Sequence, residues 1–83
     1  MLVTVRYFAG ARAAAGCAED VLEAASGAVV QDVIGRIAAR HGAKLAGVLP
    51  ACSLLLDEVA VRDRSVPVAD GSVLDVLPPF AGG

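Results

Sequence analysis

The chain has 83 residues, of which 57% are hydrophobic, and a formal net charge of −2. This length allows one small domain and leaves little room for a deep active-site cavity beside the core, which favours a protein that works with a partner over a stand-alone enzyme. The hydrophobic fraction excludes a disordered chain, and the acidic balance argues against a nucleic-acid partner.

The N-terminal segment reads as two strands. Alternation over residues 2–8 predicts a strand whose apolar face is formed by Val3, Val5 and Tyr7. The opposite face, nearer water, holds Leu2, Thr4, Arg6 and Phe8. Charged and apolar residues mix over 18–23, as is typical of an edge strand.

One long helix is predicted over residues 30–41. Apolar residues at 30, 33, 34, 37 and 38 recur at the spacing of a single buried helical stripe. Gly42 suits a left-handed stop after the last turn. Neither Ala28 nor Val29 offers a side-chain oxygen to cap the first turn.

The second half reads as a loop containing Pro50, followed by short strands at 53–56, 59–62 and 73–77. Turns are expected at Asp57-Glu58 and Asp70-Gly71. Leu77 shares a strand face with Asp75, so we do not expect it in the core.

Two strands before the long helix exclude a regular alternation of strands and helices. The order therefore predicts an α+β fold, a mixed sheet of about five strands with one main helix across one face. The open face of this sheet would be a docking surface, and it would hold Arg6, Phe8, Asp75 and Leu77.

The last six residues form the strongest functional signal. We predict a domain over 1–77 and a flexible tail over 78–83, with the sequence Pro78-Pro79-Phe80-Ala81-Gly82-Gly83. Glycine makes up about 7% of average sequence, so a terminal pair arises by chance in roughly 0.5% of chains. A frayed terminus that ends in two glycines is the alternative, and physical reasoning alone weighs the two evenly.

The residue types of the tail suit insertion of the chain end into a narrow channel of a partner protein. The two glycines lack Cβ and can enter a channel that excludes any side chain, while the two prolines stiffen the base of the tail and lower the cost of ordering it. The α-carboxylate of Gly83 has an ordinary pKa near 3.5, so it is ionised and a poor electrophile. Another enzyme would have to activate it, for instance as an acyl-adenylate.

The internal polar residues form no catalytic or metal-binding pattern in the sequence. A single histidine, His41, without a close cysteine pair predicts no metal site, and its place at a helix end favours a role with the helix dipole. Cys17 and Cys52 read as a loop thiol and a small apolar packing residue, with a sulfur relay as the alternative. The acidic residues at 57, 58 and 70 are expected in turns, and no phosphate-binding P-loop is present.

The sequence lacks a membrane span, a secretion signal and a disulfide framework. The apolar stretch at 45–56 is shorter than the about 20 residues that cross a bilayer, and the N-terminus lacks the basic start of a secretion signal. Two cysteines are too few for a disulfide framework. We therefore expect a cytoplasmic, reduced protein with no membrane partner.

Three segments carry a resemblance to a known family. Residues 8–16 resemble an F-A-x-x-R-x-x-x-G segment, residues 27–34 a helix start, and residues 68–83 a D-G-D-x-V-x-x-x-P-P-x-x-G-G ending. The chain thus resembles the small subunit of molybdopterin synthase, the MoaD family, which belongs with the ThiS-like sulfur carriers of the ubiquitin-like β-grasp fold. It departs from the family at Val29, where Thr is common, and at Asp57, where Asn is common.

The resemblance implies a sulfur-carrier cycle centred on Gly83. An E1-like adenylyltransferase (MoeB-like) would join AMP transiently to the carboxylate, and a sulfurtransferase or desulfurase would supply the sulfur of a thiocarboxylate. The large subunit of molybdopterin synthase (MoaE-like) would receive the tail, and Gly83 would pass sulfur to cyclic pyranopterin monophosphate in molybdenum cofactor biosynthesis. The chain would not be an enzyme on its own, and it would hold no resident cofactor or metal.

The resemblance also assigns further residues. Threading into the partner would use Pro78, Pro79, Phe80, Ala81 and Gly82. The partner interface would include Phe8, Arg12 and Leu77. Alternatives are a carrier for the thiamine or cysteine pathway, a ubiquitin-like modifier conjugated through Gly83, and an interaction module with an inert tail.

Overall fold

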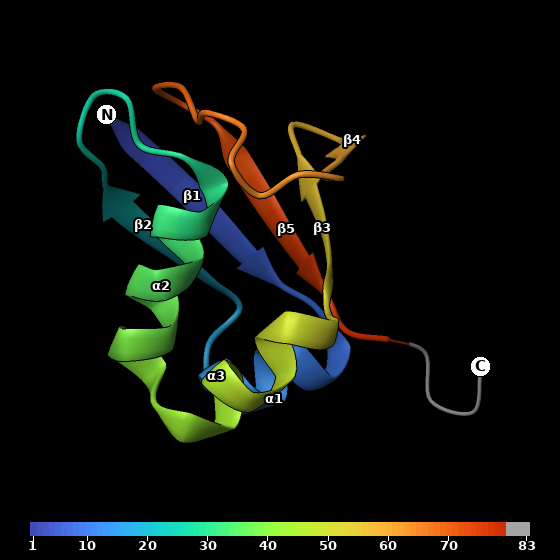
Figure 1. The fold of residues 1–83 in the computed structure, drawn as a ribbon. Coiled ribbons are helices and arrows are strands. Elements are labelled where there is room, and N and C mark those ends of the chain that lie inside the picture. Colours follow the sequence, from blue (N-terminus) through green and yellow to red (C-terminus); the bar gives the residue numbers. More distant parts are fainter. Residues whose placement is uncertain (80–83) are drawn as a thin grey trace.

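A five-stranded mixed sheet forms the frame of the protein (Figure 1). The computed structural model describes residues 1–79. The elements in chain order are β1 (Leu2–Tyr7), α1 (Ala9–Ala15), β2 (Glu19–Glu23), α2 (Val30–His41), α3 (Ala43–Val48), the 3₁₀ turn η1 (Leu49–Ala51), β3 (Ser53–Leu56), β4 (Val59–Ala60) and β5 (Val73–Leu77). The strand order is β2-β1-β5-β3-β4, in which β1 and β5 are parallel and all other neighbours antiparallel. The predicted α+β architecture with a mixed sheet is confirmed.

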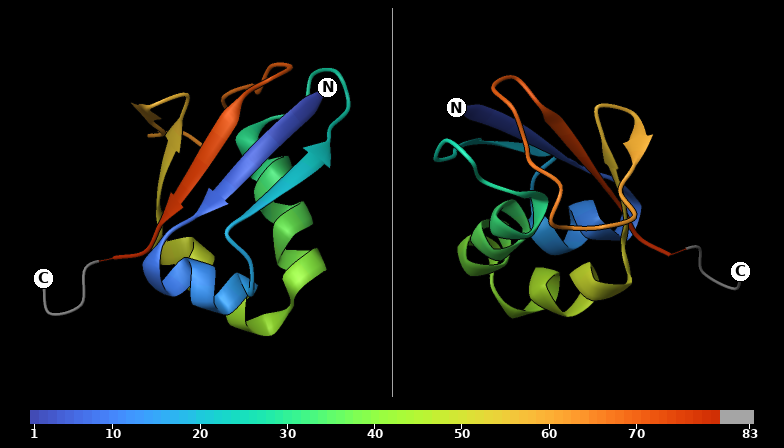
Figure 2. Two further views of the ribbon diagram at one scale, coloured as in Figure 1. Left: turned by 180° about the vertical axis from the view of Figure 1, so that it is seen from behind. Right: turned by 45° about the horizontal axis from the view of Figure 1, so that its top comes forward.

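The core lies between this sheet and α2, which crosses one face of the sheet (Figures 1 and 2). The predicted apolar face of β1 is fully buried, and so is the predicted stripe of α2 apart from Ala38, which is half-buried. Burying one aliphatic side chain of this kind contributes about 1.5–3 kcal/mol, so these two surfaces hold the helix on the sheet. No helix among residues 1–79 covers the opposite side of the sheet, which we call the open face (Figure 2).

The parallel register of β1 and β5 places their carboxyl ends together. Arg6 lies opposite Asp75, and Tyr7 lies opposite Val76. β3 then runs antiparallel to β5, with Ser53 opposite Leu77. The last residue of β5 is therefore surrounded by the end of β1 and the start of β3.

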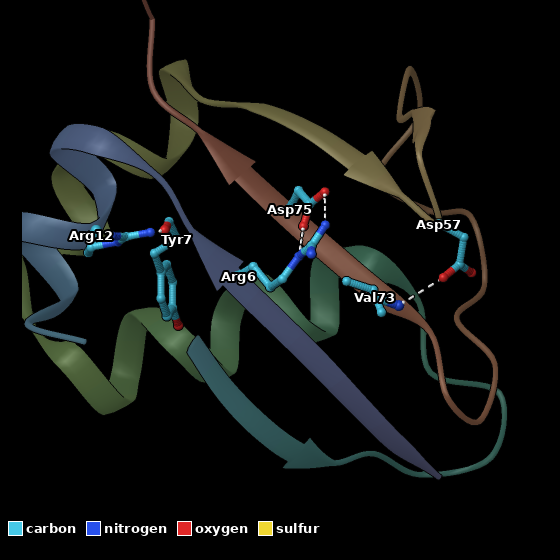
Figure 3. Close-up of polar contacts among 6 residues, drawn as sticks. All are labelled: Arg6, Tyr7, Arg12, Asp57, Val73 and Asp75. Atoms are coloured by element: carbon cyan, nitrogen blue, oxygen red, sulfur yellow. Dashed lines mark hydrogen bonds and ion pairs between the residues drawn. The ribbon is translucent and has the colours of Figure 1, made fainter. Parts of the chain in front are cut away.

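The β3–β4 hairpin turns at the two acidic residues that the sequence indicated. Asp57 and Glu58 have φ angles of 48° and 71°, as a type I′ hairpin turn requires. The Asp57 side chain also accepts a hydrogen bond from the Val73 amide at 2.9 Å (Figure 3). The turn is thereby tied to the start of β5.

Several predicted bounds differ from the structure. The prediction of one main helix is incomplete, because residues 9–15 and 43–48 form α1 and α3. Both are too short to be stable alone, so tertiary contacts such as the burial of Ala11 and Leu45 decide them. The strand predicted at 59–62 ends at Ala60, although the Val61 amide still donates to the Leu54 carbonyl at 2.9 Å.

The two ends of α2 are built without a conventional cap. At the start, the Val30 and Gln31 amides donate to the carbonyls of Val66 and Arg64 at 2.9 and 2.8 Å, in place of a cap side chain. The Val29 amide donates to the Asp32 carboxylate at 2.9 Å. At the end, Gly42 has the positive φ that was predicted, 89°, but its ψ of −165° lies outside the left-handed helical region. This conformation suits glycine and lets α3 begin at the next residue.

A buried polar cluster joins β1, β2 and the end of α2. The Tyr7 hydroxyl donates to the Asp20 carboxylate at 2.7 Å, and Nε2 of His41 lies 2.5 Å from the same oxygen. Burial alone would raise the pKa of Asp20, but hydrogen bonds from His41 and Tyr7 lower it below its usual value. His41 thus contacts a carboxylate as well as ending its helix, a contact that the sequence analysis did not foresee.

This cluster generates a stability prediction. Tyr7→Phe removes one hydrogen bond to a buried carboxylate, so we expect a loss of about 1.5–3 kcal/mol in the free energy of unfolding measured with urea. Ser65→Ala is the matched control, because it removes a hydroxyl that donates to the exposed Asp63 and should change stability little. Equal losses in the two variants would show that the cluster contributes no more than a surface contact.

Candidate functional site

The chain leaves the sheet where the parallel strands β1 and β5 end. Phe8 follows β1 and its amide donates to the Val76 carbonyl at 3.1 Å, so it lies beside the end of β5. Pro78 and Pro79 follow Leu77 outside any helix or strand and lead away from the sheet (Figures 1 and 2). Phe8 and Leu77 are both half-buried, so each keeps accessible apolar surface at this point.

Arg12 reaches the same end of the sheet from α1. The chain turns sharply at Ala9, whose φ is 47°, and the first turn of α1 brings Nε of Arg12 within 3.2 Å of the Tyr7 carbonyl (Figure 3). The Arg12 side chain is otherwise exposed. The three residues predicted for a partner interface are therefore gathered around the end of β5, and Arg12 stands on a helix.

An ion pair on the open face supports this arrangement. Nε and Nη2 of Arg6 donate to the two carboxylate oxygens of Asp75 at 2.6 and 2.9 Å (Figure 3). The hydrogen bond to Asp75 and its charge raise the pKa of Arg6, and the Asp75 side chain is only 8% exposed. The same guanidinium lies 5.8 Å from the centre of the Phe8 ring, within the range of a cation–π contact.

The pairing of Arg6 with Asp75 was missed at the level of sequence. Alternation placed both residues on the open face, but only the parallel register of β1 and β5 sets them opposite each other. Exposed Leu2 and Val21 extend apolar surface across the same face, on β1 and on the edge strand β2. The open face thus combines a fixed charge pair with accessible apolar side chains.

Three hollows in the described part of the chain lie apart from this end. One, of about 660 Å³, runs along α2 and the segment after β2, and includes Gly27 and Arg36. A second, of about 300 Å³, lies on the open face beside Asp57 and Asp75. The third, of about 450 Å³, lies at the β3–β4 hairpin and the segment after it. None of the three hollows is lined by Phe8, Arg12 or Leu77.

The predicted tail is only partly within the described residues. Pro78 is half-buried and Pro79 is exposed. The predictions for Phe80, Ala81, Gly82 and Gly83 lie outside the described residues, and their roles stay predictions. Among residues 1–79, no helix is long and apolar enough to span a bilayer.

The chain is similar in sequence and fold to proteins of one family. Residues 5–83 match the ThiS family. The molybdopterin synthase sulfur carrier subunit of Chlamydomonas reinhardtii is 34% identical over 84 aligned positions that cover both chains in full. A Pyrococcus furiosus protein provisionally described as molybdopterin converting factor subunit 1 is 30% identical, with a TM-score of 0.86 over 96% of this chain and 99% of that one.

A third relative was solved as part of a complex. Subunits 1 and 2 of molybdopterin-converting factor from Helicobacter pylori were determined together, and the matching chain has a TM-score of 0.71 at 24% identity over the full length of both chains. At that identity the likeness shows the fold. The expected ubiquitin-like β-grasp fold is confirmed by these neighbours together with the strand order.

Leu77 is half-buried, so its truncation should destabilise the protein less than truncation of a fully buried residue of β5. Leu74→Ala removes a fully buried side chain and should lower the free energy of unfolding by about 2–5 kcal/mol. Leu77→Ala should cost less than half as much, because its side chain already contacts solvent. Urea unfolding of both variants measures the difference, and equal costs would place Leu77 in the core.

Proposed function

The chain belongs to the ThiS family, and on that premise we propose that it is a sulfur carrier whose working group is the carboxylate of Gly83. The observation that carries the proposal is the extent of the family match, which runs to Gly83 and so includes the paired glycines. The fold supports it, because the predicted threading segment follows directly after Leu77, the last residue of β5.

Within the family, we place the chain as the small, sulfur-donating subunit of a molybdopterin synthase. Its 34% identity to a protein of that name, with complete coverage of both chains, supports this branch. The Pyrococcus furiosus neighbour supports it at similar identity. Such a subunit would have no catalytic activity alone and would work only when docked on a larger subunit.

The chemistry proposed at Gly83 has three steps. An E1-like enzyme transfers AMP from ATP to the carboxylate and releases pyrophosphate, which makes the carbonyl carbon electrophilic. A sulfurtransferase or desulfurase then supplies a cysteine persulfide, whose terminal sulfur displaces AMP and forms an acyl disulfide. A second thiol reduces that disulfide and leaves a thiocarboxylate on Gly83. The sulfur then forms a bond to a carbon of cyclic pyranopterin monophosphate, and hydrolysis of the resulting thioester leaves the sulfur on the substrate and returns the carboxylate for another cycle.

The geometry supports delivery of the tail into a partner. Six extended residues after Leu77 span about 20 Å, enough to reach an interior site while the folded domain stays outside. Phe8, Leu77 and Arg12 surround the base of that tail, and we propose that they contact the partner surface around the channel mouth. The Helicobacter pylori relative forms a complex with its second subunit, and we propose a corresponding large subunit as the partner here.

A change at Gly83 provides the direct test. Removing Gly83, or adding one alanine after it, should lower sulfur transfer at least ~100-fold, because it displaces or removes the reacting carboxylate. Reconstituted molybdopterin formation measures the loss, and circular dichroism should show an unchanged fold. The matched control adds one alanine before Met1, which lies at the opposite end of β1 from the tail (Figure 1).

The outcome distinguishes the proposal from its alternatives. Full activity of the extended chain would refute a role for the terminal carboxylate. Loss of higher-mass lysine conjugates in cells, with molybdopterin formation unaffected, would identify a protein modifier. Normal molybdopterin formation with a thiamine or cysteine requirement in cells would identify a carrier for that other pathway.

The interface residues give a second test. Phe8→Ala, Arg12→Ala and Leu77→Ala should each weaken binding to the large subunit by ~10–100-fold, as expected for side chains near the centre of an interface. Val59→Ala is the matched control, because this side chain is 68% exposed but pairs with Leu56, at the end of β3 remote from Leu77. Calorimetric titration measures the affinities, and an equal effect of Val59→Ala would contradict the assigned interface.

A further inference from the structure

We propose that Cys17, Asp20 and His41 form a binding site for a thiophilic divalent cation of the Zn²⁺ class, separate from the C-terminal tail. Each residue offers one donor atom of a type that zinc accepts, namely sulfur, carboxylate oxygen and imidazole nitrogen. The three donor atoms all lie within 4.8 Å of one another. The proposal is independent of the sulfur-carrier function.

The fold brings these donors together from three segments. Cys17 lies between α1 and β2, Asp20 is the second residue of β2, and His41 is the last residue of α2. Cys17 and Asp20 are three positions apart in sequence, but Asp20 and His41 are 21 apart. The sequence predicted no metal site because it has one histidine and no close cysteine pair, and α2 supplies the third donor only through tertiary structure.

The donor set suits an exchangeable zinc site. Three protein ligands with an open fourth position are typical of zinc sites that hold water or an exogenous ligand. A thiolate and a carboxylate would neutralise the two charges of the cation. The Asp20 side chain is 8% exposed and that of His41 13%, while Cys17 is half-buried, so the donors lie at the rim of the core with an approach from solvent.

The distances indicate how the cluster would change on binding. Nε2 of His41 lies 2.5 Å from Oδ2 of Asp20, a hydrogen-bond distance, and Sγ of Cys17 lies 3.9 Å from that oxygen. Two light ligand atoms on one tetrahedral zinc lie about 3.3 Å apart, so the first distance would widen by roughly 0.8 Å. The cation would occupy the place of the proton between His41 and Asp20, and the Cys17 thiol would release its proton to solvent.

Tyr7 would orient two of the ligands. Its hydroxyl donates to Oδ2 of Asp20 at 2.7 Å, and its ring meets the His41 imidazole edge to face, with centres 5.7 Å apart. Such neighbours fix ligand geometry in known metal sites. They hold the carboxylate and the imidazole near each other before any cation arrives.

The positive charge of Arg40 should weaken binding of a cation at this site. Its Nε lies 3.7 Å from Oδ1 of Asp20, so its positive charge competes for the same carboxylate. The Arg40 side chain is 55% exposed and can be removed without opening the core. Arg40→Ala should therefore strengthen cation binding a few-fold, because it removes a like charge close to the site.

The experiment titrates Co²⁺, and separately Zn²⁺, into the reduced full-length chain. We expect one ion per chain by native mass spectrometry, a thiolate-to-cobalt absorption band, and a higher melting temperature with Zn²⁺. Cys17→Ser should abolish the absorption band, and Cys17→Ser or His41→Gln should each weaken binding at least ~10–100-fold. Circular dichroism confirms that each variant is folded, and His41→Gln can still hydrogen-bond to Asp20.

Two control variants locate the ion. Cys52→Ser should bind as tightly as the unchanged chain, because its buried thiol donates to the Val48 carbonyl instead. A chain without Gly83 should also bind normally, which separates this site from the terminal carboxylate. Absence of the thiolate band, unchanged affinity in Cys17→Ser, or equal loss in Cys52→Ser would each overturn the proposal.

Discussion

The parallel pairing of β1 with β5 is the constraint on which the functional end of the molecule depends. These strands are separated by nearly the whole chain, yet their register sets Arg6 opposite Asp75 and Tyr7 opposite Val76. Because parallel strands end at the same edge, the turn into α1 and the exit of the C-terminal segment come together. A slip of one residue would turn the Arg6–Asp75 pair to opposite sides of the sheet and separate Phe8 from the base of the tail.

The same pairing fixes the strand from which the C-terminal segment leaves the sheet. β5 lies between β1 and β3, so both of its edges are hydrogen-bonded, and Leu74 and Val76 are fully buried in the core. A strand paired on both edges would stay in place while the residues after it enter a partner, as we propose. The cost of ordering then falls on the tail alone, where two prolines already restrict the backbone.

Much of this fold could be predicted from local patterns, and the misses have a common cause. The α2 helix and the buried face of β1 were predicted because periodicity over 30–41 and alternation over 2–8 are properties of contiguous sequence. The short helices α1 and α3 depend on contacts made by Ala11 and Leu45 in the assembled core. Arg6–Asp75 and Asp20–His41 depend on which strands and helices become neighbours, which no local pattern encodes. The paired glycines are a sequence signal in themselves, so the site at Gly83 could be proposed from local sequence, where it stays a prediction.

The two polar arrangements divide the molecule by function. Arg6 and Asp75 lie on the open face, where one partner is exposed and the pair can meet another protein while keeping Phe8 in place. Tyr7, Asp20 and His41 lie on the helix side of the same strands, where burial demands that every polar atom be matched. Since Arg6 and Tyr7 are adjacent in β1, a single strand carries both arrangements on its two faces. The strand that positions the proposed docking surface is therefore also held by the polar cluster on its other face.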